Sequence, residues 1–259
     1  MKSINVEIAE GIATVTLDRP PVNAVTNEAM QEMAEVFNSF ADNREVRVAI
    51  FTAAGDRAFM AGVDLKSVAS APGEETPLSS LTDSGAISRN AMWAITDCAV
   101  PVIGAINGPA IGAGLAFAAC CDIIIAAENA SFGTTEINVG LLGASAHVSL
   151  LVGRHKAREM FFTGEMVSAA ELQRLGAVRA VVPRTELDAT ARDLAKTLAS
   201  KSPLAMRLAK ASMNQVEDLP LKEAYRIEQT YTERLVKFED SAEARAAFFE
   251  KREPIWKLR

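Results

Sequence analysis

The sequence predicts an α/β protein in which short strands alternate with helices before a wholly helical end. Three observations support this class. Apolar residues alternate over 4–8 and 13–17, as in the two strands of a hairpin. A buried strand near 102–105 is followed at once by a glycine-rich turn and an alanine-rich helix. From Glu186 onward the apolar spacing is helical.

Composition narrows the class of protein further. Hydrophobic residues make up 49% of the 259 residues, enough to bury a large core. The net charge of −6 and a pI of about 5.2 do not favour nucleic-acid binding. Cys98, Cys120 and Cys121 show neither a disulfide framework nor metal-ligand spacing. The opening residues do not predict a signal peptide. We therefore expect a cytoplasmic protein without a metal centre.

The elements of the first half follow from local signals. Thr26 can cap a helix that runs to Phe37, and a strand is expected over 46–50. A polar stretch at 70–84 predicts a loop, and a helix is expected over 85–96. The 24 residues from Cys98 to Cys121 carry no charge, and about 20 could span a membrane. Two prolines and four glycines within this run instead favour the buried centre of a soluble protein.

The second half of the chain becomes helical near residue 200. A short strand is expected at 123–126, and another at 178–182. Ser168 and Glu171 form the pattern of a capping box, in which each residue satisfies a backbone N–H of the other. Further helices are expected to begin near residues 203, 220 and 241. This helical end has little apolar core of its own, so we expect it to pack on the main body or on another subunit.

The segment 105–115, with the sequence AINGPAIGAGL, is the strongest candidate for a ligand site. A strand, a turn and a helix start leave unpaired backbone N–H groups at the helix N-terminus. Gly112 and Gly114 allow a ligand to approach the backbone closely, where a developing negative oxygen could be held. The glycine spacing matches neither the dinucleotide fingerprint nor the phosphate-binding loop, which disfavours a nucleotide site.

Four segments together resemble the crotonase (enoyl-CoA hydratase/isomerase) family. They are FMAGVDLK at 59–66, the segment 105–115, CDIIIA at 121–126 and SFGTTEINVG at 131–140. DRPPVNAV at 18–25 and AFFEKR at 247–252 fit as well, so the resemblance covers essentially the whole chain. It implies a core of repeated strand-strand-helix (ββα) turns over 1–199 and a helical trimerisation region over 200–259. The implied ligand is an acyl-CoA thioester.

The resemblance also implies an oxyanion hole made by the backbone N–H groups of Val63 and Ala113. A thioester becomes reactive when charge on its carbonyl oxygen is stabilised, and each donor is worth about 3 kcal/mol in comparable sites. Ala113 lies at the predicted helix start, where the helix dipole adds to the effect. Asp64 and Asp122 are interpreted as structural residues that accept backbone hydrogen bonds.

Glu136 matches the second catalytic glutamate of the family and is the candidate for proton transfer. Two features depart from the hydratase pattern. The position of the first glutamate, four residues after Gly112, holds Ala116, and the usual Pro-Gly after the second glutamate is replaced by Gly143-Ala144.

Each titratable candidate also has a structural interpretation. Glu136 could lie on a solvated face, although its apolar neighbours Phe132 and Ile137 argue against full exposure. His147 could replace the missing acid or simply pack in the interior, and we favour packing. His155 is expected at the surface.

We therefore predict an acyl-CoA enzyme, nominally an enoyl-CoA hydratase (a lyase) of the kind found in fatty acid metabolism. Hydratases of the family hold water between two glutamates, whereas isomerases move a double bond with one. A 3,2-enoyl-CoA isomerase that uses Glu136 alone is the alternative, and a non-catalytic acyl-CoA binder is another. The resemblance implies no cofactor beyond the CoA of the substrate, and a homotrimer or a dimer of trimers.

The remaining candidates concern CoA itself. Backbone contacts with CoA are expected near residues 21–25 and beside the loop that carries Val63. Phe248 and Lys251 are expected to contact CoA from a neighbouring subunit. Lysines suit phosphate as point charges, although Lys251 could equally be a solvated surface residue. The predicted CoA-binding residues are Pro21, Val22, Ala24, Ala61, Lys66, Gly112, Phe248 and Lys251.

Overall fold

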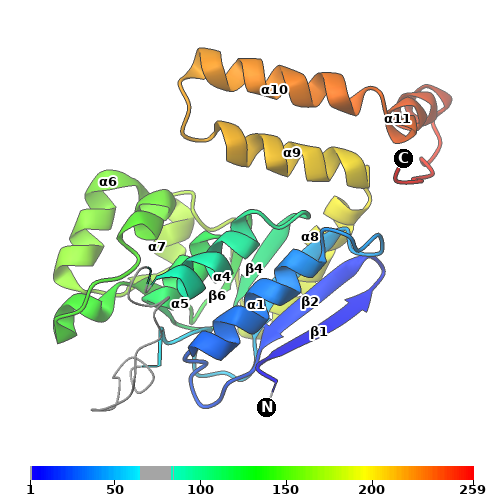
Figure 1. The fold of residues 1–259 in the computed structure, drawn as a ribbon. Coiled ribbons are helices and arrows are strands. Elements are labelled where there is room, and N and C mark those ends of the chain that lie inside the picture. Colours follow the sequence, from blue (N-terminus) through cyan, green and yellow to red (C-terminus); the bar gives the residue numbers. More distant parts are fainter. Residues whose placement is uncertain (1, 65–82, 84) are drawn as a thin grey trace.

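A computed structural model describes residues 2–64, 83 and 85–259 (Figure 1). Apart from Asp83, the predicted loop at 70–84 lies outside the described residues. The chain forms a sheet with helices on its faces, and a helical C-terminal region extends beyond it, which confirms the predicted α/β class. Among the described residues, no helix combines the length and the apolar character needed to cross a membrane.

The main sheet has six strands in the order β1-β2-β3-β4-β6-β9. They are β1 (Ile4–Ala9), β2 (Ile12–Leu17), β3 (Val48–Ala53), β4 (Val102–Ile106), β6 (Ile123–Ala127) and β9 (Ala180–Val182). β1 and β2 form the predicted antiparallel hairpin, and every other pair is parallel. All five residues of β4 are buried, as expected for a central parallel strand. The carboxyl ends of β2, β3, β4 and β6 therefore meet at one edge.

A second, three-stranded sheet lies just beyond that edge, in the order β5-β7-β8. It is built from β5 (Ala110–Ile111), β7 (Ser131–Gly133) and β8 (Val167–Ser168). β5 continues from β4 and leads into α5 (Ala113–Ala119), and β7 continues from β6 and leads into α6 (Ser145–Thr163) through the 3₁₀ turn η1 (Thr135–Val139). This succession of strand, strand and helix confirms the repeated ββα unit. The short second sheet itself was not predicted.

Helices cover both faces of the main sheet. On one face α1 (Asn27–Ser39) lies beside α4 (Ala86–Thr96). Thr26 caps α1 as predicted, and Phe37 packs edge-to-face on Phe51, with ring centroids 5.7 Å apart. On the other face α8 (Leu187–Ala199), which follows the 3₁₀ turn η2 (Arg184–Glu186), buries a row of alanines against residues such as Ile103. Alternate side chains along β2, β3 and β4 supply the two cores.

One local prediction needs correction, and one long helix was not predicted. Ser168 caps α7 (Ala169–Arg174) by accepting from the N–H of Glu171 at 3.2 Å. The reciprocal half of the capping box is wrong, because the Glu171 carboxylate accepts two hydrogen bonds from the guanidinium of Arg174 instead. The long helix α6 was not predicted either. It bends at Gly153, where φ is 71° and ψ is 172°, and this bend breaks the regular apolar spacing.

The C-terminal region consists of α9 (Pro203–Val216), α10 (Leu221–Leu235) and α11 (Glu239–Glu250). Figure 1 shows α9 and α10 side by side, with α11 beyond them. α10 packs on α9 and contains no buried residue in the single chain. This confirms the predicted helical end with little core of its own. The division of the chain into 1–199 and 200–259 stays a prediction.

A buried lysine fastens α9 to the rest of the molecule. The ammonium of Lys210, a residue only 6% exposed, donates to the carbonyls of Ile95 at 3.0 Å and Val100 at 3.3 Å. It also pairs with Asp122 at 2.7 Å. The same carboxylate oxygen of Asp122 accepts from the N–H of Val102, at the start of β4. The structural role expected for Asp122 is thus confirmed, and the expectation that the helical end packs on the main body also holds.

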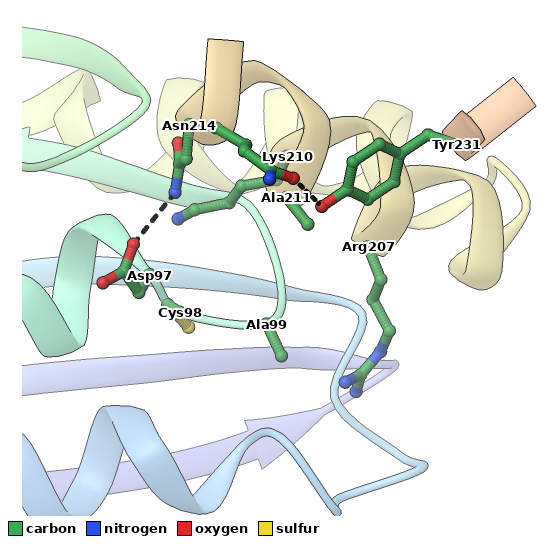
Figure 2. Close-up of a pocket in the computed structure, with 9 residues that line it drawn as sticks. Asp97, Cys98, Ala99, Arg207, Lys210, Ala211, Asn214 and Tyr231 are labelled. Carbon is green, nitrogen blue, oxygen red and sulfur yellow. Dashed lines mark hydrogen bonds between the residues drawn. The ribbon is translucent and has the colours of Figure 1, made fainter. Parts of the chain in front are cut away.

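The cavity beside this lysine has a volume of about 380 Å³ (Figure 2). Its polar side chains already have partners. The Asn214 amide donates to the Thr96 carbonyl at 2.7 Å, and Arg207 donates to the carbonyls of Phe40 and Ala41. Tyr231 donates to the side chain of Gln215. We therefore interpret this cavity as the junction between α9 and the body. Its lining residues are Asp97, Cys98, Ala99, Arg207, Lys210, Ala211, Asn214, Gln215 and Tyr231.

Replacing Lys210 with methionine tests this anchor. Lys210→Met leaves the buried carbonyls of Ile95 and Val100 without their donor and the partly exposed Asp122 carboxylate without its cation, which is expected to cost about 2 kcal/mol of unfolding free energy. Urea denaturation measures the loss. Lys196→Met, an exposed substitution on α8, is the matched control and should stay within about 0.5 kcal/mol of the wild type. Equal stability of the two variants would contradict the anchor.

Candidate functional site

The candidate site is built from loops that follow the strands of the main sheet. The loop after β2 and the loop after β3 are joined by three backbone hydrogen bonds. The N–H of Ala61 donates to Val22 at 3.1 Å, that of Val25 to Gly62 at 2.9 Å, and that of Asp64 to Val25 at 2.8 Å. These bonds bring the segment 22–25 alongside the predicted oxyanion loop, as a short parallel bridge.

The loop after β3 is joined in turn to the loop after β4. The N–H of Met60 donates to Pro109 at 3.2 Å, and the N–H of Ile111 donates to Met60 at 2.9 Å. A third bond, from Gly112 to Gly133 at 2.8 Å, continues the ladder to β7. Four segments distant in sequence therefore lie side by side at one edge of the sheet.

This ladder leaves the two predicted oxyanion donors free. In the bridge between Val25 and Val63, the bonds use the carbonyl of residue 62 and the N–H of residue 64. The N–H of Val63 therefore points away from Val25. Ala113 is the first residue of α5, where N–H groups have no partner within the helix. Neither N–H has an acceptor among the described residues.

Two glycines allow the donor segments to touch. A Cβ added at Gly114 would lie 2.2 Å from the carbonyl oxygen of Met60. A Cβ at Gly62, where φ is +94°, would lie 3.3 Å from the carbonyl oxygen of Ile111. The start of α5 thus lies directly against the loop that carries Val63. Because of this contact, both N–H groups occur in the same small region of the molecule.

Two buried asparagines hold the loop that precedes Val63. The amide of Asn23 donates to the carbonyls of Ala54 and Ala58, both at 2.9 Å. The amide of Asn107 donates to Ala53 at 2.8 Å and Gly55 at 3.0 Å. These hydrogen bonds satisfy backbone carbonyls at the end of β3 and in the loop that follows it. Sequence reasoning missed this role. The available signal was an asparagine within each of two apolar segments, where a buried amide needs partners.

Glu136 lies in η1, just after β7, and its side chain reaches the start of α5. The residue is half-buried, and its Oε2 is buried without a hydrogen bond from any described residue. A Cβ added at Gly112 would lie 2.1 Å from Oε1 of Glu136. Since Gly112 immediately precedes Ala113, the structure brings this carboxylate and one predicted donor together. Glu136 is therefore partly enclosed rather than fully exposed, although its neighbours Ile137 and Val139 are exposed.

The position at which hydratases of the family carry the first glutamate lies one turn into α5. The N–H of Ala116 donates to the carbonyl of Gly112 at 3.1 Å, one helical turn away. Ala116 is fully buried and its methyl group offers no acid or base. The carboxylate that the structure places beside the start of α5 is that of Glu136.

The two histidines differ in their surroundings. His147 lies in the first turn of α6 and is half-buried, and this burial lowers the pKa of its imidazole below the usual value. It makes no hydrogen bond to another described residue. The neutral ring is consistent with packing, and replacement of the missing acid stays a prediction. His155 is exposed on α6, as expected.

The predicted CoA-binding residues divide into two groups. Val22, Ala24 and Ala61 lie at the same edge as Val63 and are half-buried, and Pro21 is exposed beside them. Phe248 is 79% exposed on α11, which lies well apart from α5 in Figure 1. Lys251, also exposed, follows at the end of that helix. Within one chain these two residues do not join the edge. Lys66 lies outside the described residues, and all these contacts with CoA stay predictions.

Residues 7–259 match the family described as enoyl-CoA hydratase/isomerase. The chain belongs to this family. A solved enoyl-CoA hydratase from Bacillus anthracis superposes with a TM-score of 0.91 at 31% identity, covering 99% of this chain and 100% of that one. The crotonase fold predicted from the sequence is therefore confirmed.

Other relatives of this chain are named as a hydrolase and as a dehydratase rather than as a hydratase. A (7aS)-7a-methyl-1,5-dioxo-2,3,5,6,7,7a-hexahydro-1H-indene-carboxyl-CoA hydrolase from Rhodococcus jostii (strain RHA1) is 39% identical over 95% of this chain and 93% of its own length. A carnitinyl-CoA dehydratase from Proteus mirabilis (strain HI4320) is 36% identical over 100% of this chain and 99% of its own. These similarities support an acyl-CoA enzyme of the hydratase, dehydratase or hydrolase kind.

Substitution of Gly114 tests whether contact between the two donor loops matters. A methyl group at position 114 meets backbone rather than a flexible side chain, so Gly114→Ala must push α5 away from Met60. We expect a loss of about 2 kcal/mol of unfolding free energy from overpacking. Turnover should fall about 100-fold, because the two N–H groups no longer converge.

Gly55→Ala is the reference variant, since a Cβ there meets nothing within 4 Å and adds only the strain of a positive φ. Denaturation and steady-state kinetics measure the two effects. Full activity in Gly114→Ala would contradict the convergence of the loops.

Proposed function

We propose that this protein transfers a proton at the carbon next to the thioester carbonyl of an acyl-CoA, with Glu136 as its single acid-base group. The observation that carries the proposal is the placement of the Glu136 carboxylate beside the start of α5. The N–H of Ala113 begins that helix, and the N–H of Val63 lies in the loop against it. Two free donors and one carboxylate supply what an enolate intermediate requires.

The reaction that best suits one carboxylate is migration of a double bond from the 3 to the 2 position of an enoyl-CoA. Glu136 removes a proton from C2, and the electron pair moves onto the thioester oxygen, which the N–H groups of Val63 and Ala113 stabilise. The protonated Glu136 then returns the proton to C4, and the double bond is left between C2 and C3. One group gives back the proton that it took, so no second acid is needed.

Water addition to a 2-enoyl-CoA, the nominal assignment, is less well supported. Hydration needs a base for the water and an acid for C2, and Ala116 can be neither. The family membership and the solved hydratase at 31% identity still favour testing it. A hydratase would have to use Glu136 for both steps, or recruit His147 as the second group.

Hydrolysis is a second candidate, and the 39% identity to the indene-carboxyl-CoA hydrolase favours it. One carboxylate can activate a water for attack on a carbonyl carbon, and the two N–H groups can hold the resulting oxyanion. With a cyclic keto-acyl-CoA as probe, cleavage of the thioester releases free CoA. Cleavage of a ring carbon–carbon bond instead adds one water to a product that keeps its thioester. Mass spectrometry distinguishes these outcomes from isomerisation, which leaves the mass unchanged.

The cofactor requirement, the oligomeric state and the cellular compartment are part of the same proposal. Proton transfer and hydrolysis need no group beyond the CoA of the substrate, so we propose no cofactor. A trimer or a dimer of trimers would cover α10, which exposes Leu221 and Tyr225 in the single chain. It would also bring Phe248 and Lys251 from one copy toward the site of another.

The three cysteines are buried and unpaired, and burial raises the pKa of Cys120 to about 11, which suits a reducing cytoplasm.

Replacing Glu136 with glutamine tests the proposal directly. Glu136→Gln keeps the size of the side chain but removes its basicity, so isomerisation of 3-hexenoyl-CoA should fall about 1,000-fold. Binding of hexanoyl-CoA, measured by calorimetry, should change less than about threefold, because the donors and the CoA contacts remain. Incubation in D₂O gives a second readout, since any deuterium that exchanges onto the protonated Glu136 should be delivered to C4 of the product.

The outcomes separate the candidate functions. Loss of isomerisation and of deuterium uptake in the variant supports proton transfer by Glu136. Rapid water addition by the wild type without double-bond migration would contradict the isomerase and restore the hydratase. A protein that binds hexanoyl-CoA but converts none of these thioesters is a non-catalytic binder, and the proposal would then be wrong.

A further inference from the structure

We propose that Gly143 is a positioning residue, whose missing side chain leaves the space that the Glu136 carboxylate occupies. The inference rests on the proposed function, in which Glu136 carries the proton. It concerns how this chain places its single acid-base group beside the thioester. Gly143 itself touches no reacting atom in this account.

The chain path brings position 143 back to Glu136. η1 ends at Gly140, which has a left-handed conformation with φ of 73°. The N–H of Leu141 donates to the carbonyl of Glu136 at 2.9 Å, which closes a tight turn. The chain then passes the Glu136 side chain before α6 begins at Ser145. Position 143 is therefore held against the carboxylate by a hydrogen-bonded turn.

The carboxylate lies between two glycines. An added Cβ would be 2.1 Å from Oε1 of Glu136 if built at Gly112, and 2.7 Å from the same oxygen if built at Gly143. Both distances are too short for any real carbon to occupy. Either position can therefore accept a side chain only if the carboxylate moves. The other oxygen, Oε2, is buried and receives no hydrogen bond from the described residues.

A side chain at position 143 would test contact with the Glu136 carboxylate alone, whereas one at position 112 would also strain the backbone. Gly112 has φ of +55°, so any side chain there would also strain the backbone. Gly143 has no such constraint. The three atoms nearest to a Cβ at Gly143 all belong to Glu136, with Cδ at 3.4 Å and Cγ at 3.7 Å. A methyl group at 143 thus meets chiefly the end of one flexible side chain.

The expected displacement is small but sufficient. To reach ordinary van der Waals separation from a methyl group at 143, Oε1 must move by about 1 Å. A shift of this size in a reacting group can lower a rate by about 100-fold. Where the family pattern has Pro-Gly, this chain has Gly143-Ala144, and the missing side chain at 143 leaves space for Oε1 of Glu136. This chain lacks a carboxylate at position 116 and keeps position 143 empty for the carboxylate that remains.

The test compares Gly143→Ala in two backgrounds, with 3-hexenoyl-CoA as substrate and deuterium uptake at C4 as the second readout. In the wild-type background we expect kcat to fall about 100-fold. The Kd for hexanoyl-CoA should stay within about twofold, and the urea midpoint should stay close to that of the wild type. In a Glu136→Asp background, the carboxyl carbon takes the position of Cγ, which lies 3.7 Å from the added methyl group, so the overlap is largely relieved. Gly143→Ala should then lower kcat less than about threefold further, because the two positions are coupled.

The controls distinguish this proposal from the proposed function. Ser149→Ala alters an exposed residue in the first half of α6, shortly after position 143, and should leave kcat, Kd and stability unchanged. If Glu136→Gln is inactive and Gly143→Ala has wild-type kcat, the positioning role is wrong and the proposed function stands. An equal loss from Gly143→Ala in both backgrounds would also overturn it, since a general structural defect ignores the length of side chain 136. If Glu136→Gln stays active, the proposed function fails and this inference fails with it.

Discussion

The backbone ladder at the carboxyl edge of the sheet is the constraint on which the site depends. It joins the loops that follow β2, β3 and β4 and ends on β7, through bonds such as Ala61 to Val22 and Gly112 to Gly133. Every N–H used in the ladder is unavailable to a ligand. The N–H groups of Val63 and Ala113 are left over by its geometry, so the same hydrogen bonds that hold the loops also create the two donors.

Small residues make that arrangement compact. Gly114 lets α5 touch the carbonyl of Met60, and Gly112 and Gly143 leave room for the Glu136 carboxylate. Such close approaches require the neighbouring loops to be held firmly, and the buried amides of asparagines hold the preceding loop. The C-terminal helices are anchored at the opposite end of β4, where Lys210 donates to the carbonyls of Ile95 and Val100 and pairs with Asp122. Close packing and hydrogen bonding therefore shape the site, whereas this ion pair holds α9 on the body.

Much of this could be predicted from the sequence, because the relevant signals are local. The hairpin, the buried β4 and the glycine-rich start of α5 each have a distinct apolar or turn pattern. The three-stranded second sheet could not be predicted, since β5 has two residues and depends entirely on distant partners. The resemblance named Glu136 and the two donors, but only coordinates show that Gly143 adjoins the carboxylate. A glycine outside a motif gives no sign of what its missing Cβ makes room for.

The most direct test is a crystal structure of the protein with hexanoyl-CoA bound. The account predicts that the thioester oxygen lies about 3 Å from the backbone nitrogens of both Val63 and Ala113. It also predicts that a carboxylate oxygen of Glu136 faces C2 of the acyl chain. A thioester oxygen bound away from either nitrogen, or a Glu136 carboxylate turned from C2, would contradict the account while leaving the family assignment intact.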